Sequence, residues 1–481
     1  MSTHTVLVPA ELGDRTEVIQ AALDSGPRPC RVVLLPGRHL CGGLKLPSRT
    51  ELHLSQGAEL EFLSTYDAFA ENTVGVIAED SDRAMIVATD ADEIAITGEG
   101  SILAGGDHYS EGDDADMGTR LPFAERPRVI VFEDCRDVRL EDFGVGRSPM
   151  WTLHLVNCEA VALRGIRVDN DRRMPNTDGI VIDGCRDVVI ADCDIATADD
   201  GIVLKTSHRM EGTTASCQRI TVRDCRIESL SCALKIGTET FGDVCDITFE
   251  NCQIVRSNRA LGIFSRDGGA IRRVRFSSIA VDCRETAAGY WGSGEALTIN
   301  RLDRRPGDLP AGDISDVVVE DVSGCMQGAL NLYSDPPGHI TNVVLRRIAL
   351  VQAAGPLGTA LEVDLRPGPA DLQGEVADTG RKNAWRKDAD GRLIGLEPYP
   401  GGMPGLFARG VSELVVEDVE IVRPDPLPKG WNVDSAMLVD CLERLCAGAG
   451  TGSRGASRAG GGSDCLLPTT GLIDFQRGEE Q

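Results

Sequence analysis

Short segments of alternating apolar and polar residues recur along this chain. Alternation with period two predicts β-strands with one buried face, and the Gly, Asp, Asn and Ser clusters between the segments predict turns. The first apolar residues of the clearest segments lie 23 to 32 residues apart along the sequence. The apolar pairs in these segments are Val138/Leu140, Val161/Leu163, Val188/Ile190, Ile220/Val222, Ile247/Phe249 and Val274/Phe276.

Repeats of this length indicate a solenoid. A single repeat cannot bury its own apolar face, so successive repeats must stack and share one continuous core. We therefore expect an all-β protein built as a parallel β-helix over residues 31–425. Further pairs extend the pattern in both directions, at Ile94/Ile96, Val317/Val319, Val343/Leu345 and Leu414/Val416.

Cysteines keep a constant position relative to these strands. Four of them lie three residues before an apolar pair, at Cys135, Cys158, Cys185 and Cys217. This phase predicts a ladder of small buried thiols, one on each coil. Stacked thiols can come within bridging distance, so disulfides stay open as an alternative.

The two ends of the solenoid are expected to differ from the repeat. An open end exposes core and strand edges, so residues 1–30 are interpreted as a cap with a helix at 14–25. Asp14 is its expected N-cap, with Glu17 as capping partner, and the expected apolar face contains Val18, Ile19, Ala22 and Leu23. Residues 363–407 are expected to form a long excursion, and residues 426–481 a C-terminal segment with a flexible Gly- and Ser-rich tail at 446–463.

Charge and hydropathy narrow the range of partners. The chain has 75 acidic and 49 basic residues and a formal net charge of -26, which opposes binding to nucleic acids or anionic membranes. Its sequence shows no apolar run of about 18 residues and no basic leader followed by an apolar segment. The expected location is cytoplasmic, or secreted if an export segment has been trimmed.

One local motif occurs twice. Asp178-Gly179-Ile180-Val181-Ile182 is repeated as Asp200-Gly201-Ile202-Val203-Leu204, and Asp199 precedes the second copy. Equivalent residues on adjacent coils stack about 4.8 Å apart, so three carboxylates are expected to meet. Crowded carboxylates have divergent pKa values, as the acid and base of glycosidic cleavage require. Structural Asp-Gly turns and a calcium site are the alternatives.

These motifs resemble those of glycoside hydrolase family 28, the polygalacturonase-like enzymes of the pectin-lyase-like superfamily. Asn176-Thr177-Asp178-Gly179 followed by Asp199-Asp200 is similar to the family's Asn-Thr-Asp and Asp-Asp motifs, with Gly237-Thr238-Glu239 after them. The resemblance implies a right-handed parallel β-helix and inverting hydrolysis of pectic or related oligosaccharides. It implies that Asp199 is the general acid, and that Asp178 and Asp200 hold and deprotonate the water. Inversion predicts carboxyl groups about 6.5–9.5 Å apart.

The sequence departs from the family pattern at two places. Ser231 stands where the family has a histidine, and Gly262-Ile263-Phe264 stands where it has Arg-Ile-Lys, the motif that holds a substrate carboxylate. A uronate needs a compensating cation, and Arg259, Arg266 and Lys235 are the candidate replacements. Without one, the sugar beside the scissile bond would be neutral, for example rhamnose or xylose.

Further residues are expected to contact the substrate. Trp151 aligns one coil before Asp178, where its ring either stacks on a sugar or forms part of the cleft wall. Lys205 follows the doubled aspartate and either faces the cleft or is solvated. The expected substrate-binding set is Asn176, Trp151, His154, Lys205, Lys235, Glu239, Arg266, Trp291 and Glu295.

Two other functions fit the same architecture. A polysaccharide lyase would need a neutralised uronate and a strong Arg or Lys base. A non-catalytic glycan-binding β-helix would tolerate the two departures but would give no reason for three converging aspartates. No metal-ligand spacing, phosphate-binding glycine loop or nucleophile elbow is found, so no cofactor and no metal are expected.

Overall fold

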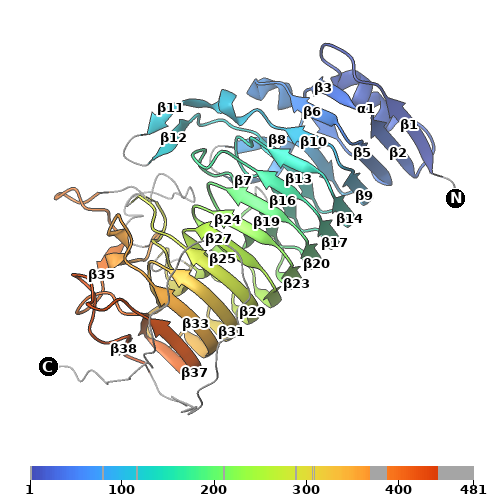
Figure 1. Ribbon diagram of the computed structural model, residues 1–481. Helices are drawn as coiled ribbons and strands as arrows, with labels where there is room; N and C mark the ends of the chain where they lie inside the picture. The colour runs from blue at the N-terminus through green and yellow to red at the C-terminus, as the bar shows by residue number, and fades with distance from the viewer. Residues whose placement is uncertain are drawn as a thin grey trace, which may run out of the picture.

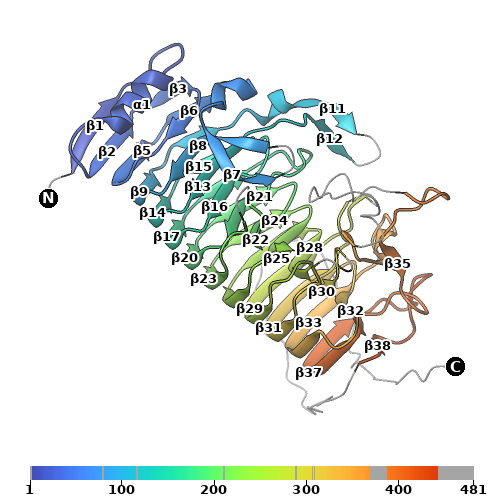
Figure 2. The same ribbon diagram turned by 180° about the vertical axis from the view of Figure 1, so that it is seen from behind.

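The protein is a right-handed parallel β-helix whose strands form three walls around one core (Figure 1). The first strand β1 and the last strand β38 lie at opposite ends of the solenoid, which Figure 2 shows from behind. No helix in the described part of the chain is long and apolar enough to span a membrane. The computed structural model describes residues 3–78, 81–114, 118–209, 212–287, 290–305, 307, 309–368 and 387–441.

The first wall contains the repeated apolar pairs. Its strands are β1 (His4–Val8), β2 (Cys30–Leu34), β5 (Thr50–Leu54), β9 (Asp92–Thr97), β14 (Arg136–Glu141), β17 (Glu159–Arg164), β20 (Arg186–Ala191), β23 (Cys217–Arg223), β26 (Val244–Glu250), β29 (Ile271–Cys283), β31 (Ile314–Met326), β33 (Ile340–Gln352) and β37 (Val411–Val422).

The second wall has shorter strands and merges with the first at β29, which pairs with both β26 and β27. Its separate strands are β3 (Gly37–Cys41), β6 (Ala58–Phe62), β10 (Ser101–Leu103), β15 (Gly144–Gly146), β18 (Arg167–Asp169), β21 (Asp194–Thr197), β24 (Arg226–Ser229) and β27 (Gln253–Ser257).

Two strands of the third wall directly follow the turns that contain Asp178, Asp199 and Asp200. The strands of this wall are β4 (Leu44–Lys45), β8 (Ser81–Thr89), β13 (Arg128–Glu133), β16 (Leu153–Val156), β19 (Ile180–Asp183), β22 (Ile202–Thr206), β25 (Cys232–Thr240), β28 (Arg259–Ser265), β30 (Leu297–Leu302), β32 (Leu330–Asp335), β36 (Leu406–Arg409) and β38 (Ala436–Val439). Strand β7 (Thr73–Ala78) runs antiparallel to β8.

The register confirms the repeat read from the sequence. Val138 pairs with Val161, and Val161 pairs with Val188, so the apolar pairs stack in phase. Val317 and Val343 continue the same row. Their side chains are buried and form one continuous core, because each coil covers the apolar face of the next.

Corners between the first two walls use single residues in the left-handed region. Asp192, Asp224 and Asn251 have φ values of 57°, 56° and 51° and lie between paired strands of the two walls. Asp and Asn tolerate this conformation better than other non-glycine residues. The Asp and Asn residues that predicted turns in the sequence therefore lie at the corners between the walls.

The predicted cysteine ladder is confirmed. Cys135, Cys158, Cys185 and Cys217 are buried free thiols, and the backbone amide of Cys158 donates to the Sγ atom of Cys185 over 3.2 Å. No disulfide joins the cysteines of this ladder, so the alternative of bridging is not supported there.

The N-terminal helix is present with a different start and a narrower apolar face. Helix α1 (Thr16–Asp24) buries Ile19, Ala22 and Leu23, whereas Val18 is 44% exposed, so the expectation for Val18 was wrong. Arg15 is the N-cap, and Asp14 instead accepts a 2.9 Å hydrogen bond from the amide of Thr16. The one-residue shift follows from a backbone bridge between Asp14 and Leu40, which holds Asp14 outside the helix.

The chain leaves the solenoid between β33 and β36. This excursion contains the 3₁₀ turn η3 (Thr359–Leu361) and an antiparallel pair, β34 (Glu362–Asp364) with β35 (Leu396–Pro398). Strand β36 then rejoins the third wall beside β32. The tail expected at 446–463 lies outside the described residues.

Candidate active site

The two copies of the Asp-Gly motif stack on adjacent coils. Ile180 pairs with Ile202, and the amide of Gly179 donates to the carbonyl of Asp200 over 2.9 Å. A Cβ atom at Gly179 would lie 2.6 Å from the carbonyl oxygen of Gly201, too close for any side chain. Glycine at this position therefore lets the backbones approach and brings Asp178 next to Asp200.

The three carboxylates meet as expected. One oxygen each of Asp178, Asp199 and Asp200 lies within 4.8 Å of the other two. Asp178 and Asp200 are 2% and 1% exposed, whereas Asp199 is more exposed. Two oxygens at this spacing can share one water, because each water hydrogen bond spans about 2.8 Å.

This spacing corrects one expectation from the sequence. Inverting glycosidases have carboxyl groups about 6.5–9.5 Å apart, and retaining ones about 5–5.5 Å. The nearest oxygens here lie below the inverting range. The close approach follows from the one-rung stacking of Asp178 on Asp200, which leaves no intervening coil to separate them.

Burial and mutual repulsion perturb the cluster. Burial, with the charges of Asp199 and Asp200, raises the pKa of Asp178 well above its ordinary value. Burial and the charge of Asp200 raise the pKa of Asp199 to about 6. A cluster with these values holds a proton near neutral pH, which a general acid requires.

Asp200 has two partners of its own. Lys235 Nζ lies 2.6 Å from its Oδ2 atom, and the Ser231 hydroxyl donates to Oδ1 over 2.9 Å. Both contacts stabilise a negative charge on Asp200. Ser231 therefore contacts the carboxylate cluster directly.

A second charged group borders the cluster. Lys205 Nζ lies 2.7 Å from Glu239 and 4.7 Å from the centre of the Trp151 ring. Burial alone would lower the pKa of Lys205, but the charges of Glu239, Asp178 and Asp200 outweigh it and hold this pKa above its usual range. Lys205 is therefore a fixed positive charge beside the carboxylates.

Glu239 is held between two cations. Its pKa would be raised by burial, but Lys205 and Arg304 hold it far below its ordinary value. Arg304 Nη2 lies 3.6 Å from Glu239. Arg304 is a site residue that sequence reasoning missed, because it follows the third-wall strand β30 two coils later and carries no motif.

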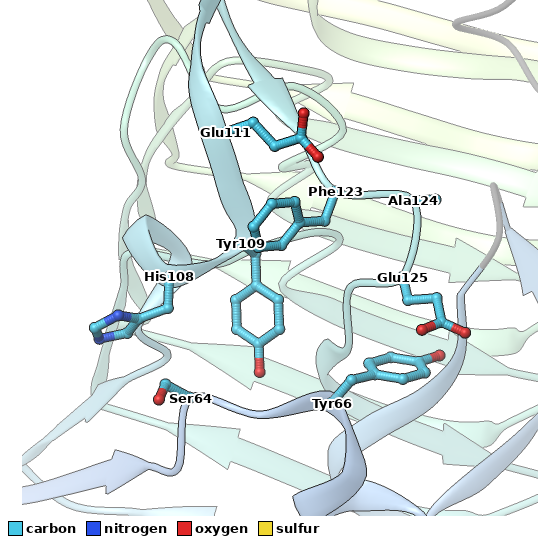
Figure 3. A pocket seen from close by; sticks show the side chains of 8 residues that line it. All are labelled: Ser64, Tyr66, His108, Tyr109, Glu111, Phe123, Ala124 and Glu125. Atoms are coloured by element: carbon cyan, nitrogen blue, oxygen red, sulfur yellow. The ribbon is translucent and has the colours of Figure 1, made fainter.

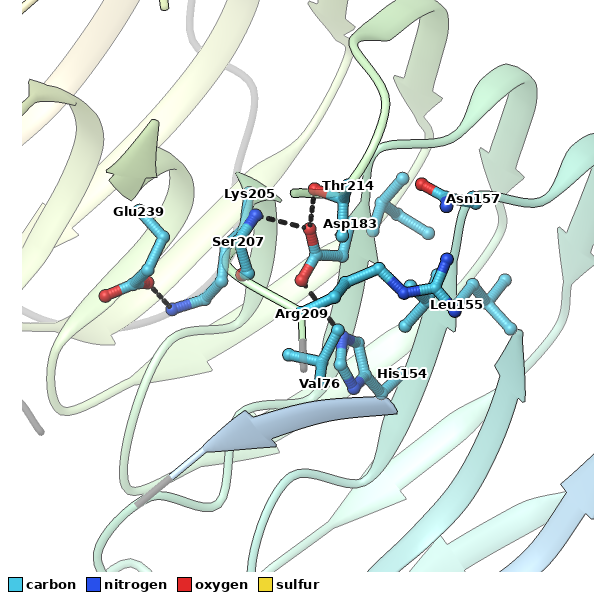
Figure 4. Close-up of polar contacts among 12 residues, drawn as sticks. Val76, His154, Leu155, Asn157, Asp183, Lys205, Ser207, Arg209, Thr214 and Glu239 are labelled. Carbon is cyan, nitrogen blue, oxygen red and sulfur yellow. Dashed lines mark hydrogen bonds and ion pairs between the residues drawn. The ribbon is translucent and has the colours of Figure 1, made fainter. Parts of the chain in front are cut away.

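His154 is not placed to bind substrate. It is fully buried outside the solenoid core, where strand β7 covers it, and it lies 3.3 Å from Asp183 (Figure 4). Arg128 Nη1 lies 2.9 Å from its Nδ1 atom. Burial lowers the pKa of His154 to about 4. Its expected role as a substrate contact is corrected to an internal one, since β7 could not be placed over it from the sequence.

Arg266 is also directed elsewhere. It is fully buried, and its guanidinium donates to the backbone carbonyls of Pro367 and Asn300 over 2.8 and 3.3 Å. The excursion therefore uses Arg266 as an anchor, and its expected substrate role is corrected. Nothing in the local sequence signalled the contact, which spans 101 positions along the chain.

The loop before β30 forms a second charged cluster. Glu295 is 2% exposed and lies 3.5 Å from Arg259, whose Nη2 atom is 3.4 Å from Asp364. The carboxylate of Glu295 is held by Arg259 and by the backbone amide of Ser293, so its expected substrate role is corrected to an internal one. Arg259 is likewise occupied by these two acids.

The loop before β30 also contacts the coil that carries Asp199. The Tyr290 hydroxyl donates to the carbonyl of Ala198, the residue before Asp199. Trp291 is partly exposed, and the Arg366 guanidinium lies 5.6 Å from its ring centre. Tyr290 was not in the expected substrate-binding set, although it directly precedes Trp291 in the sequence.

Asn176 is held in place by a buried arginine. The Arg126 guanidinium donates to Asn176 Oδ1 over 2.9 Å and to the carbonyl of Pro175 over 2.9 Å. These contacts fix the turn that precedes Asp178. Sequence reasoning missed Arg126, which is buried ahead of strand β13.

The carboxylate trio could also hold a metal ion by distance alone. Calcium takes six to eight oxygen ligands, whereas this cluster offers three carboxylates and already has Lys235 on Asp200. An ammonium group thus supplies the positive charge that a cation would bring. The residues fit acid and base chemistry better than calcium binding.

Comparison with known proteins places the chain in a family. A probable polygalacturonase from Arabidopsis thaliana is 28% identical over 32% of this chain and 36% of its own length. One from Vitis vinifera is 24% identical over 48% of this chain and 47% of its own length, so the chain spans less than half of both relatives. The family 28 exopolygalacturonase of Yersinia enterocolitica superposes with a TM-score of 0.67 at 15% identity, over 93% of this chain and 78% of that one. Residues 43–351 match the glycosyl hydrolases family 28 profile, and the chain therefore belongs to this family.

Proposed function

We propose that this protein hydrolyses O-glycosidic bonds in pectic or related oligosaccharides. The observation that carries the proposal is the meeting of Asp178, Asp199 and Asp200, with a raised pKa at two of them and a lysine on the third. Membership of family 28 and the polygalacturonase names of its relatives support the substrate class.

The roles follow from exposure and charge. Asp199 is the most exposed of the three and retains a proton near pH 6, so it donates that proton to the leaving glycosidic oxygen. Asp200, whose negative charge Lys235 and Ser231 stabilise, removes a proton from the attacking water. Asp178 orients this water, and the water oxygen forms the new bond to the anomeric carbon as the old C–O bond breaks.

Inversion of the anomeric centre is part of the proposal. It rests on the family motifs, because the carboxylate spacing by itself is shorter than the usual inverting range. NMR of the first product formed from a β- or α-linked substrate tests it, since the product anomer is visible before mutarotation. A product that keeps the substrate's configuration would contradict inversion and leave hydrolysis intact.

The cations near the site favour a neutral sugar beside the scissile bond. Lys235 and Lys205 are held by Asp200 and Glu239 at 2.6 and 2.7 Å, and Arg259 lies between Glu295 and Asp364. A uronate carboxylate would have to displace one of these acids. We therefore place the cleavage next to a sugar such as rhamnose or xylose.

A panel of defined oligosaccharides tests the activity. We expect release of reducing ends from pectic oligosaccharides with neutral units and slower cleavage of plain oligogalacturonides. A lyase would instead give unsaturated products that absorb ultraviolet light; Lys205, which keeps its proton, is a poor base for that reaction. A binding module would show no turnover on any member of the panel.

We also propose a reducing, cytoplasmic location. The stacked cysteines Cys135, Cys158 and Cys185 are free, although neighbouring thiols in such a ladder are prone to oxidation in secreted proteins. Fractionation of the source cells with an antibody against this chain tests the location, and recovery from the culture medium would contradict it.

A further inference from the structure

A separate pocket lies before the catalytic coils. It has a volume of about 760 Å³ and is lined by Ser64, Tyr66, His108, Tyr109, Glu111, Phe123, Ala124 and Glu125 (Figure 3). Tyr66 begins the 3₁₀ turn η1 (Tyr66–Phe69), and His108 and Tyr109 end the 3₁₀ turn η2 (Gly106–Tyr109). The others come from the hairpin of β11 (Ser110–Asp114) and β12 (Thr119–Pro122), from the segment directly after β12, and from the segment before η1. None of them was singled out by the sequence.

Tyr109 offers an unused hydroxyl group. Its side chain is 2% exposed and points into the pocket, and its OH has no hydrogen-bond partner among the described residues (Figure 3). The hydroxyl of Tyr66 is already paired with Asp82, to which it donates over 2.5 Å. A buried unpaired hydroxyl costs stability, so a ligand that bonds to Tyr109 recovers this cost.

Gly106 lets the η2 turn, which contains Tyr109, pack directly against the backbone of the next coil. The amide of Gly106 donates to the carbonyl of Arg147 over 2.6 Å, and a Cβ atom at Gly106 would lie 2.7 Å from the carbonyl oxygen of Ser148. Tyr109 therefore projects from a turn that is fixed by backbone contact. A fixed aromatic hydroxyl is pre-organised for one ligand geometry.

The rest of the lining has the chemistry of sugar recognition. Phe123 is 38% exposed and gives a ring on which a pyranose can stack. Glu111 and Glu125 are exposed carboxylates, which accept hydrogen bonds from sugar hydroxyls. Rings with convergent polar groups are typical of small-ligand sites.

The charges around the pocket exclude an acidic sugar. Its titratable lining residues, besides the two tyrosines, are two glutamates and His108, and it has no lysine or arginine. Neighbouring arginines are committed to acids: Arg83 pairs with Asp67 at 3.2 Å, and Arg120 with Asp171 at 2.5 Å. A uronate carboxylate would meet two like charges without a counter-charge, which lowers its affinity.

The pocket is joined to the catalytic coil. Arg126, one residue after the lining residue Glu125, donates to Asn176 in the turn before Asp178. The connection that carries Tyr109 lies two coils before the connection that carries Asp178, or about 10 Å along the axis at one strand spacing per coil. A single oligosaccharide can therefore reach both places.

We infer that this pocket binds a neutral pyranose unit of the substrate, away from the bond that is cleaved. The inference rests on the proposed glycan hydrolase function and adds a second recognition point to it. The pocket would select for substrates whose sugar unit at this place has no carboxylate. It would therefore distinguish pectic chains with neutral branches from plain galacturonan.

Saturation-transfer NMR titrations test the pocket directly. The probes are methyl β-D-galactopyranoside and methyl β-D-galactopyranosiduronate, which differ only by oxidation at C6, with the full-length Asp199→Asn variant to prevent turnover. We expect the galactoside to bind about tenfold more tightly, and 0.5 M salt to narrow the difference because it screens the glutamates. Equal or tighter binding of the uronate would overturn the proposal.

Two variants locate the binding. Tyr109→Phe, which removes only the hydroxyl, and Phe123→Ala should each weaken galactoside binding about fivefold to tenfold. Leu121→Ala is the matched control, because Leu121 is 43% exposed in β12 but does not line the pocket. Unchanged binding in both pocket variants would place the sugar elsewhere and end the proposal.

Kinetics separate this proposal from the hydrolase proposal. In the otherwise wild-type enzyme, Tyr109→Phe should raise KM for a galactose-bearing pectic oligosaccharide and leave kcat within twofold. A wild-type enzyme that hydrolyses glycans without binding the galactoside would refute the pocket alone. Galactoside binding without any hydrolysis would refute the hydrolase function alone.

Discussion

Lys235 Nζ lies 2.6 Å from Oδ2 of Asp200, although the two residues are 35 positions apart in the sequence. One turn of the solenoid brings β25 beside β22 and places the ammonium group on the carboxylate. The two members of this pair act in opposite directions on the neighbouring acids. The charge of Asp200 raises the pKa of Asp178 and Asp199, and the charge of Lys235 lowers it. A base and an acid can then coexist within 4.8 Å.

Replacing the proposed acid tests its role. Asp199→Asn should lower kcat by about a hundredfold to ten-thousandfold on natural oligosaccharides, because the leaving oxygen departs without a proton. On an aryl glycoside with an acidic phenol as leaving group, which needs no protonation, the loss should be far smaller. Steady-state kinetics on both substrates measure the difference, and equal losses would assign Asp199 another role.

The pH dependence of the reaction should report the same group. Asp199 has a pKa of about 6, and a general acid works only while protonated. We therefore expect kcat/KM to fall above about pH 6, approaching tenfold per pH unit. A profile that is flat from pH 5 to 8 would contradict the assignment.

Removing Lys235 should shift the alkaline limb of this pH profile, that is, the pH at which kcat/KM begins to fall. The ammonium group lowers the pKa of both Asp178 and Asp199, so Lys235→Gln should shift the alkaline limb to higher pH while kcat falls. Lys235→Arg keeps the charge and serves as the control, with the limb near its original position. A structural role alone would lower activity without shifting the profile.

The buried histidine should make the fold sensitive to acid. Burial lowers the pKa of His154 to about 4, whereas an unfolded histidine titrates near 6.5. Between these values the unfolded chain binds a proton that the native state refuses, so stability falls by about 3 kcal/mol as pH drops from 6.5 to 4. Below pH 4 the native site also binds its proton and this loss levels off.

Urea unfolding at several pH values measures the effect. His154→Gln should reduce the slope of unfolding free energy against pH in that window, even though its stability at pH 7 is lower. His208→Gln is the control, since His208 is exposed. A slope that His208→Gln reduces as much as His154→Gln does would assign it to another group.

The repeat and its register could be predicted from the sequence with little error. Val138, Val161 and Val188 pair in the expected row, and Asp178 stacks on Asp200 as the duplicated motif required. Period-two alternation and a fixed coil length are local properties, and a parallel solenoid converts them directly into spatial neighbours. The meeting of Asp178, Asp199 and Asp200 was predictable for the same reason.

Contacts made outside the strands were not predictable in this way. His154 and Arg266 were expected to face a substrate, but β7 and the excursion cover them. Glu295 was expected to do the same, but it is paired with Arg259 inside the loop before β30. These segments lie outside the repeat, so periodicity along the chain does not predict their path. The sequence therefore could not indicate which polar residues of the third wall remain open.

The amino-acid sequence by itself determined the solenoid, its register and the three carboxylates that this register brings together, because those follow from periodicity along the chain. Only the tertiary structure decided how the carboxylates are charged, since Lys235, Lys205 and Arg304 act through burial and distance across different coils. It also decided the existence of the Tyr109 pocket, whose walls come from turns that share no pattern. Charge interactions and cavities depend on the distances between side chains in space. The sequence pattern determines those distances only for residues within the repeating strands.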